Sequence, residues 1–134
     1  MTDDSLTRLL AMLDDLDADV DATIDLADEV ATHGGPELRP RLEAELSRAV
    51  TERNGYAREL LGGVLAGVAG PAVLPVLVRA SAVDLGDDQD GLATEIVDLV
   101  QADPAAARTL LQPLTHDDDL TVAHRADWAL RFAP

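Results

Sequence analysis

A repeated Gly-Pro motif constrains the fold of this 134-residue chain more than any other feature. Residues 35–42 read Gly-Pro-Glu-Leu-Arg-Pro-Arg-Leu and residues 70–77 read Gly-Pro-Ala-Val-Leu-Pro-Val-Leu, so the glycine, both prolines and the last leucine recur. Residues 103–110 keep the first proline and the final leucine. The first prolines are 35 and 33 residues apart. An interval of this size is typical of one supersecondary unit in a repeat protein.

Each unit is predicted to hold two helices. Proline is favoured just inside a helix start because its missing N–H would be unpaired there, and a glycine before it ends the previous helix. Apolar residues recur at steps of three and four, which places them on one helix face. The predicted first helices cover residues 4–14, 36–52, 71–82 and 104–115, and the second helices cover 18–32, 55–69, 89–102 and 119–132. One long helix is an alternative over the first thirty residues, where no glycine or proline interrupts the apolar period.

A lone helix pair cannot bury its apolar face, so the pairs are expected to stack. The predicted fold is all-α: a short right-handed α-solenoid of about four antiparallel helix pairs, in one domain that spans residues 1–134. Its units cover roughly residues 4–33, 36–69, 71–102 and 104–133. Aromatic residues make up only 2% of the chain, so Leu, Val and Ala must build the core.

Two segments, residues 56–77 and 110–130, resemble HEAT repeats of the HEAT/PBS-lyase type. Residues 56–77 (YARELLGGVLAGVAGPAVLPVL) are similar to the corner where a small-residue helix ends at Gly-Pro and a leucine-rich helix follows. Residues 110–130 (LLQPLTHDDDLTVAHRADWAL) combine a leucine helix, an acidic turn and a Val/Ala helix, but read Val122-Ala123 where the family usually has Val-Arg. The resemblance implies a protein-binding scaffold and transfers no catalytic residue. HEAT-like families also include lyases and cofactor chaperones. A bound chromophore would indicate that this chain has a function of that kind.

The charge of the chain limits its partners. With 19 Asp, 7 Glu, 10 Arg and no Lys, the formal net charge is −16. Such a field repels phosphate backbones, so nucleic-acid binding is not expected. A GC-rich or salt-adapted genome would also favour this composition. The chain has no cysteine, which excludes disulfides and thiolate sites and is neutral between compartments. Its first residues lack the basic and then apolar layout of a secretory signal, which predicts a cytoplasmic location.

The segment Leu60–Val78 contains nineteen uncharged residues, enough for a membrane span, with Gly63 and Gly67 in a small-xxx-small spacing. Gly70-Pro71 and a second proline divide it into two pieces, each as long as one helix of the repeat. No membrane partner is therefore predicted.

Acidic residues recur on one side of the N-terminal helical region. Asp14, Asp21, Asp25 and Asp28 are separated by seven, four and three residues, which makes one stripe on a helix. The first 35 residues carry ten acids and one arginine. The stripe is a candidate docking face for a protein with a basic surface. Alternatively, it is a solvated outer face or the terminal cap that a solenoid needs.

An aromatic pair is the second candidate contact site. Trp128 and Phe132 are four residues apart on the last predicted helix, beside its stripe of core residues. They are candidates for an exposed anchor, the type of residue that dominates protein interfaces. The alternative is that they fold over the preceding helix and close the C-terminal end.

No motif indicates a metal, a cofactor or catalysis. Residues 86–91 (GDDQDG) suggest a calcium loop, but the alignment puts a glycine at its first position and Val97 at its twelfth, where ligands are essential. Asp87, Asp88 and Asp90, like residues 117–119, fit positions near a helix N-terminus better. The three histidines lack metal-ligand spacing, and neither a nucleophile elbow nor a phosphate loop with lysine occurs.

The predicted function is therefore a protein–protein interaction scaffold or adaptor, not an enzyme, that binds a partner through one face of the helical stack. The alternative is an acidic inhibitor or immunity-type protein that masks a basic or nucleic-acid-binding site on its target. Asp21, Asp25 and Asp28 carry that alternative.

Overall fold

The computed structural model describes residues 2–86 and 90–134. All regular elements in these residues are helices, so the predicted all-α fold class is confirmed. The α-helices are α1 (Thr2–Asp14), α2 (Val20–His33), α3 (Arg39–Thr51), α4 (Gly55–Ala69), α5 (Leu74–Ser81), α6 (Asp90–Ala102), α7 (Pro104–Leu111) and α8 (Leu120–Leu130). Short 3₁₀ helices η1 (Pro36–Leu38), η2 (Gly70–Val73) and η3 (Pro113–His116) precede α3, α5 and α8.

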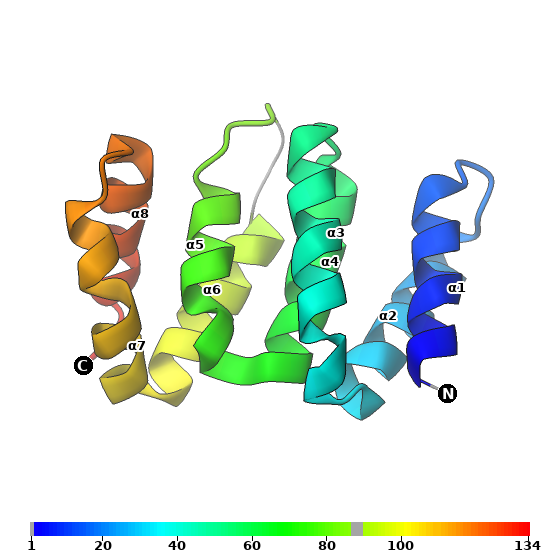
Figure 1. Ribbon diagram of the computed structural model, residues 1–134, viewed down its shortest axis with the longest axis horizontal. Coiled ribbons are helices and arrows are strands. Elements are labelled where there is room, and N and C mark those ends of the chain that lie inside the picture. Colours follow the sequence, from blue (N-terminus) through cyan, green and yellow to red (C-terminus); the bar gives the residue numbers. More distant parts are fainter. Residues whose placement is uncertain (1, 87–89) are drawn as a thin grey trace.

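The helices form two layers (Figure 1). Helices α1, α3, α5 and α7 make the first-helix layer at the front, and α2, α4, α6 and α8 make the second-helix layer behind it. Each helix of the first layer contacts the helix that follows it in sequence, and α2, α4, α6 and α8 contact one another in that order. The two termini lie at opposite ends of the long axis (Figure 1).

Prolines set the start of α3 and α5. Pro36 and Pro71 lie in the short 3₁₀ helices, and Pro40 and Pro75 take the second position of the α-helices that follow. A proline costs little there because the first N–H groups of a helix have no intrahelical partner. Gly70, which ends α4, has φ = 66°, a left-handed conformation that glycine adopts without strain.

The first thirty residues form a helix pair, so the alternative of one long helix is wrong. Helix α1 ends at Asp14 and α2 begins at Val20. Between them, the Asp15 carboxylate accepts a hydrogen bond from the Asp17 N–H at 2.9 Å. Aspartate side chains that bind nearby backbone groups favour turns over helix interiors, which explains the break without a glycine or proline.

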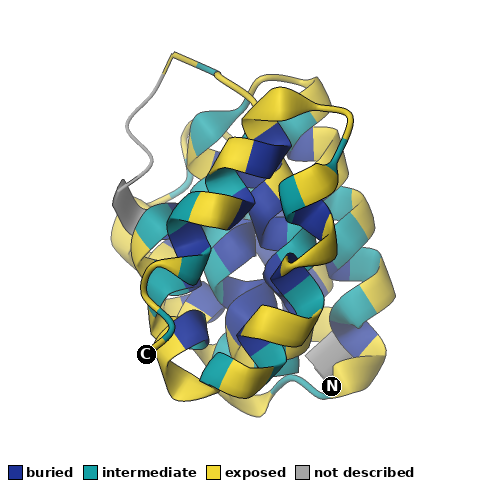
Figure 2. Cartoon of the chain, turned by 90° about the vertical axis from the view of Figure 1, so that its left-hand side faces the viewer, coloured by how far each residue is buried: buried dark blue, intermediate teal, exposed yellow. Residues whose placement is uncertain are grey.

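One apolar core fills the space where the two layers meet (Figure 2). It extends from Leu6 and Leu9 of α1 to Ala126 and Ala129 of α8 and consists mainly of Leu, Val and Ala, as the composition predicts. A Cβ added at Gly67 would lie 2.8 Å from the Cβ of Ala31. This glycine therefore allows α4 to approach α2 closely.

Arg58 of α4 is fully buried in this core. Its Nη1 donates hydrogen bonds to the backbone oxygens of Ala80, at 3.1 Å, and Val83, at 2.6 Å. These oxygens belong to the end of α5 and the residues after it, where backbone acceptors lack helical partners. The guanidinium therefore caps α5 and meets the negative end of its dipole.

The segment Gly55–Ser81, which comprises α4, η2 and α5, is long and apolar enough to cross a membrane by length and composition alone. Half of its most apolar window is buried inside the protein. The core helices of soluble proteins pass the same test, so this is weak evidence for a span. In the structure the chain reverses at η2, and α4 and α5 lie in different layers (Figure 1).

Candidate functional site

A hollow of about 410 Å³ lies on the second-helix layer, along α4 and between α2 and α6. We call it the α4 groove. It is lined by Ala27, Asp28 and Ala31 of α2, by Glu59, Leu60, Gly63, Val64, Ala66 and Gly67 of α4, and by Glu95 and Leu99 of α6.

Two glycines of α4 shape the floor of the groove in different ways. A Cβ at Gly63 would meet only the Glu95 carboxylate, with Oε1 at 3.5 Å, which is an ordinary contact distance. Gly63 therefore has room for a Cβ beneath the Glu95 carboxylate. Gly67 instead adjoins Ala31 at a distance that excludes a side chain, so it holds α2 against α4. At these two positions the floor of the groove is backbone.

Three carboxylates line the groove, one from each helix: Asp28 of α2, Glu59 of α4 and Glu95 of α6. Burial raises the pKa of Glu95, and the nearby Asp98 carboxylate raises it further. Within the part of the chain that the structure describes, no hydrogen bond or ion pair engages any of these three carboxylates. Their charges are therefore available to a ligand.

Exposed apolar side chains extend the groove towards the N-terminal ends of α2 and α4. Val20 and Ile24 are 57% and 40% exposed and precede Ala27 by seven and three residues, on the same side of α2. Tyr56 is 47% exposed and precedes Gly63 by seven residues, on the same side of α4. The outward face of the second-helix layer thus combines apolar and acidic side chains.

The acidic stripe predicted from the sequence is only partly on one surface. Asp21, Asp25 and Asp28 are exposed on α2, and Asp28 lines the α4 groove. Asp14 belongs to α1, where its carboxylate binds Arg48 of α3 at 3.1 Å. The prediction that Asp14 belongs to the stripe was wrong, because the chain turns between α1 and α2.

The aromatic pair lies at the C-terminal end, away from the groove lining. Trp128 is half-buried and packs against the core, and Phe132 follows two residues after the end of α8. The ring centroids are 5.3 Å apart in an edge-on arrangement, and the Arg125 guanidinium carbon lies 5.1 Å from the centre of the Trp128 ring. The tryptophan therefore helps to cover the end of the core, with Phe132 at its edge.

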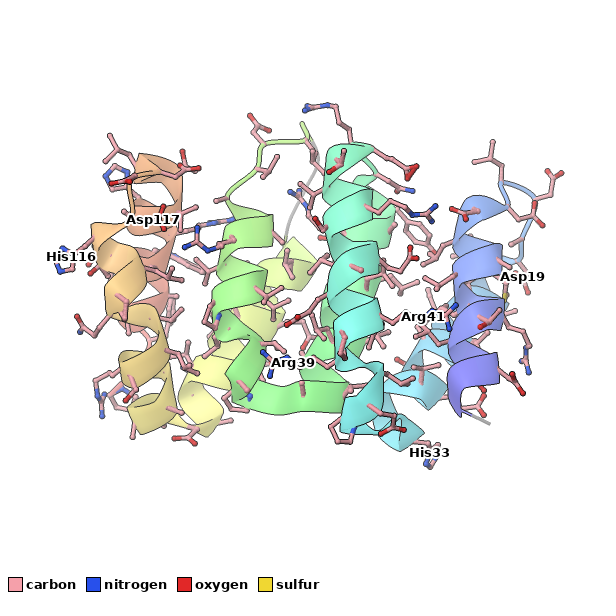
Figure 3. All side chains as sticks on the ribbon, viewed as in Figure 1. Asp19, His33, Arg39, Arg41, His116 and Asp117 are labelled. Carbon is pink, nitrogen blue, oxygen red and sulfur yellow. The ribbon has the colours of Figure 1, made fainter. Side chains whose placement is uncertain are left out.

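The acidic turn before α8 acts as predicted at a helix N-terminus. The Asp119 carboxylate accepts a hydrogen bond from the Thr121 N–H at 2.9 Å. The Asp117 carboxylate accepts a hydrogen bond from the Asp119 N–H and forms an ion pair with Arg79 of α5 at 2.6 Å (Figure 3). These two interactions lower the pKa of Asp117. Asp87 and Asp88, for which a similar role was predicted, lie outside the described residues.

At two further hollows, charged side chains already form ion pairs or a contact with an aromatic ring. Between α3 and α5, Glu43 binds Arg39, and Arg79 binds Asp117. Arg39 also donates to the backbone oxygen of Ala72 in η2, at 3.4 Å (Figure 3). Beside α8, Arg125 stacks on the indole ring. No group of three or more His, Asp or Glu side chains in the described residues has the arrangement of a metal site.

The sequence predictions missed Glu59, Glu95, Gly63 and Tyr56. The available signal was the spacing of Tyr56, Gly63 and Gly67, which puts them opposite the buried face of α4. The two glycines were noted only as a possible membrane motif, although they serve as a groove floor.

Comparison with known proteins gives no match to a family model, to a curated protein or to a solved structure.

Proposed function

We propose that this chain is a HEAT-like α-solenoid of four helix pairs, an adaptor that binds another protein through the α4 groove. The resemblance of residues 56–77 and 110–130 to HEAT repeats supports the fold assignment. The two layers agree with it, as do ion pairs that link residues about one repeat apart, such as Arg48 with Asp14 and Arg79 with Asp117. The proposed location is the cytoplasm.

The observation that carries the proposed function is the groove itself. Its lining combines a floor of small residues with carboxylates that have no partner in the described structure, and exposed apolar side chains adjoin it. Apolar surface supplies binding energy, and fixed charges supply specificity. A net charge of −16 favours a protein over a nucleic acid as the partner.

The test is affinity capture with a variant that fills the groove. Gly63→Leu places a branched side chain above α4, whereas Ala44→Leu adds the same side chain at an exposed position of α3 in the other layer. We expect a protein to be recovered by the unmodified chain and by Ala44→Leu, and to be lost with Gly63→Leu. Circular dichroism of both variants checks that they are folded. Equal recovery by the two variants would contradict the proposal.

A second candidate function, an acidic inhibitor that masks a basic site, is favoured by the exposure of Asp21 and Asp25 on α2. This function needs the outer side of α2 more than the groove. The double variant Asp21→Asn and Asp25→Asn should abolish binding to a target in that case. Under the groove proposal, the same variant should keep most of the affinity.

A further inference from the structure

We infer that the α4 groove binds an amphipathic helix whose apolar stripe is flanked on both sides by lysine or arginine side chains. This inference rests on the proposed function and names the chemistry of the partner. It follows from the shape of the groove and from the charges on its two walls.

The shape of the groove fits a helix that lies along α4. Neighbouring helices pack with their axes about 8–10 Å apart, so the axes of α2 and α6, on either side of α4, are about 16–20 Å apart. A helix with its side chains is about 10–12 Å across, so one that lies on α4 covers α4 and reaches the facing sides of α2 and α6. Gly63 presents no side chain, so a docked helix can approach the backbone of α4 beside the Glu95 carboxylate. Leu60 and Leu99 provide apolar contact beside it.

The charges select a basic helix. Asp28 and Glu95 approach from opposite walls and Glu59 from the floor helix, so cationic side chains on either side of a docked helix meet a carboxylate. Asp98 adds to the negative field at the α6 wall. An acidic helix would place like charges together in a partly desolvated groove, which is unfavourable. Tyr56, at the N-terminal end of the same face of α4, offers a ring to a cation that extends beyond the groove.

The probe is a synthetic helical peptide of the same length as the 15-residue helix α4, with a stripe of alanine and leucine that has lysine on both of its sides. A second peptide has glutamine in place of every lysine. Calorimetric titration compares three proteins: the unmodified chain, the groove variant Asp28→Asn/Glu59→Gln/Glu95→Gln, and the control variant Asp17→Asn/Glu37→Gln/Asp118→Asn. Both triple variants remove three negative charges, but the control positions are exposed and lie outside the groove lining.

We expect the unmodified chain and the control variant to bind the lysine peptide at least about tenfold more tightly than the groove variant does, a difference of about 1.4 kcal/mol. The glutamine peptide should bind weakly to all three. Equal losses in both triple variants would show a response to bulk charge alone and would overturn the inference. Equal binding of both peptides, abolished by Gly63→Leu, would overturn the inference but leave the groove as a protein-binding site. No binding of either peptide, together with unchanged capture by Gly63→Leu, would contradict both proposals.

Discussion

Two glycines four residues apart on α4 have opposite structural roles, and alanine substitutions distinguish them. At Gly63 a new Cβ meets only a carboxylate oxygen at 3.5 Å, so Gly63→Ala should gain helix propensity and stabilise the fold by about 0.5–1 kcal/mol. At Gly67 the new Cβ lies 2.8 Å from Ala31, so Gly67→Ala should destabilise the fold by about 1–3 kcal/mol. Urea denaturation of both variants measures the two changes. Shifts of the same sign would show that the contact between α2 and α4 differs from that described.

Glu95 makes the stability depend on pH in a defined direction. Burial and Asp98 raise its pKa in the folded protein, so the folded state holds the proton more tightly than the unfolded chain does. The contribution of Glu95 to stability is therefore fully favourable below the unfolded pKa and is lost as the pH rises through the folded pKa.

The variant Glu95→Gln removes this penalty. We expect it to unfold at a higher temperature than the unmodified chain at neutral pH, with the difference vanishing well below about pH 4, where a free glutamate is protonated. Thermal denaturation across this range is the measurement, with Asp118→Asn, an exposed position, as the control. A stabilisation that persists at acidic pH would contradict the proposed cause.

Part of the site was predictable from single residues, and part was not. Asp28 was identified from its spacing with Asp21 and Asp25, because one helix fixes that relation. Glu59 and Glu95 are 36 residues apart in sequence and belong to different helices, so only the packing of α4 beside α6 brings both to the groove. Gly63 and Gly67 have the spacing of a membrane motif. Their different roles follow only from the residues that contact them in the fold, Glu95 at Gly63 and Ala31 at Gly67.

At the scale of elements, α5 depends on a residue from another helix. It spans only the eight residues Leu74–Ser81, and Arg58 of α4 binds the backbone oxygens at and just beyond its C-terminal end. Arg58→Met would leave these buried acceptors without the guanidinium, and we expect a loss of about 2–4 kcal/mol in the free energy of unfolding. Arg131→Met, which removes an exposed arginine from the end of the chain, should cost less than about 0.5 kcal/mol. Similar losses in both variants would show that Arg58 acts only through net charge.

The helix boundaries followed the sequence where local chemistry sets them. The predicted helix over residues 55–69 matches α4 because the Asn54 side chain caps its start, accepting from the Ala57 N–H at 3.0 Å, and Gly70 ends it. The predicted helix over residues 104–115 is too long, because Pro113 interrupts it and α7 ends at Leu111. Burial of Arg58 had no sequence signal, since it depends on the C-terminal end of α5 lying within hydrogen-bond distance of the guanidinium.

For the whole molecule, charge repulsion opposes the compact state. The net charge is −16, and the first 35 residues, which form α1 and α2, carry ten acids against one arginine. These charges lie on one end of an elongated stack (Figure 1). Repulsion between exposed charges acts over about a Debye length, which falls from about 30 Å at 0.01 M salt to about 3 Å at 1 M. Salt should therefore stabilise this fold through screening.

We expect the melting temperature to rise steadily between about 0.01 M and 1 M sodium chloride. The triple variant Asp17→Asn/Asp21→Asn/Asp25→Asn, which relieves repulsion at the α1–α2 end, should melt higher than the unmodified chain at low salt and should gain less from added salt. The variant Glu37→Gln/Asp118→Asn, with exposed carboxylates elsewhere, should gain less at low salt because residues 36–134 carry nine arginines against 16 acids, a smaller excess of negative charge than in the first 35 residues. A low-salt stabilisation that is the same per charge removed in both variants would mean that the repulsion is spread over the whole stack.

Binding of the lysine peptide should weaken over the same range, because screening reduces its attraction to the groove carboxylates. Salt would thus move stability and affinity in opposite directions, because the same screening weakens both the repulsion among carboxylates in the free protein and the attraction of the groove carboxylates for a basic partner.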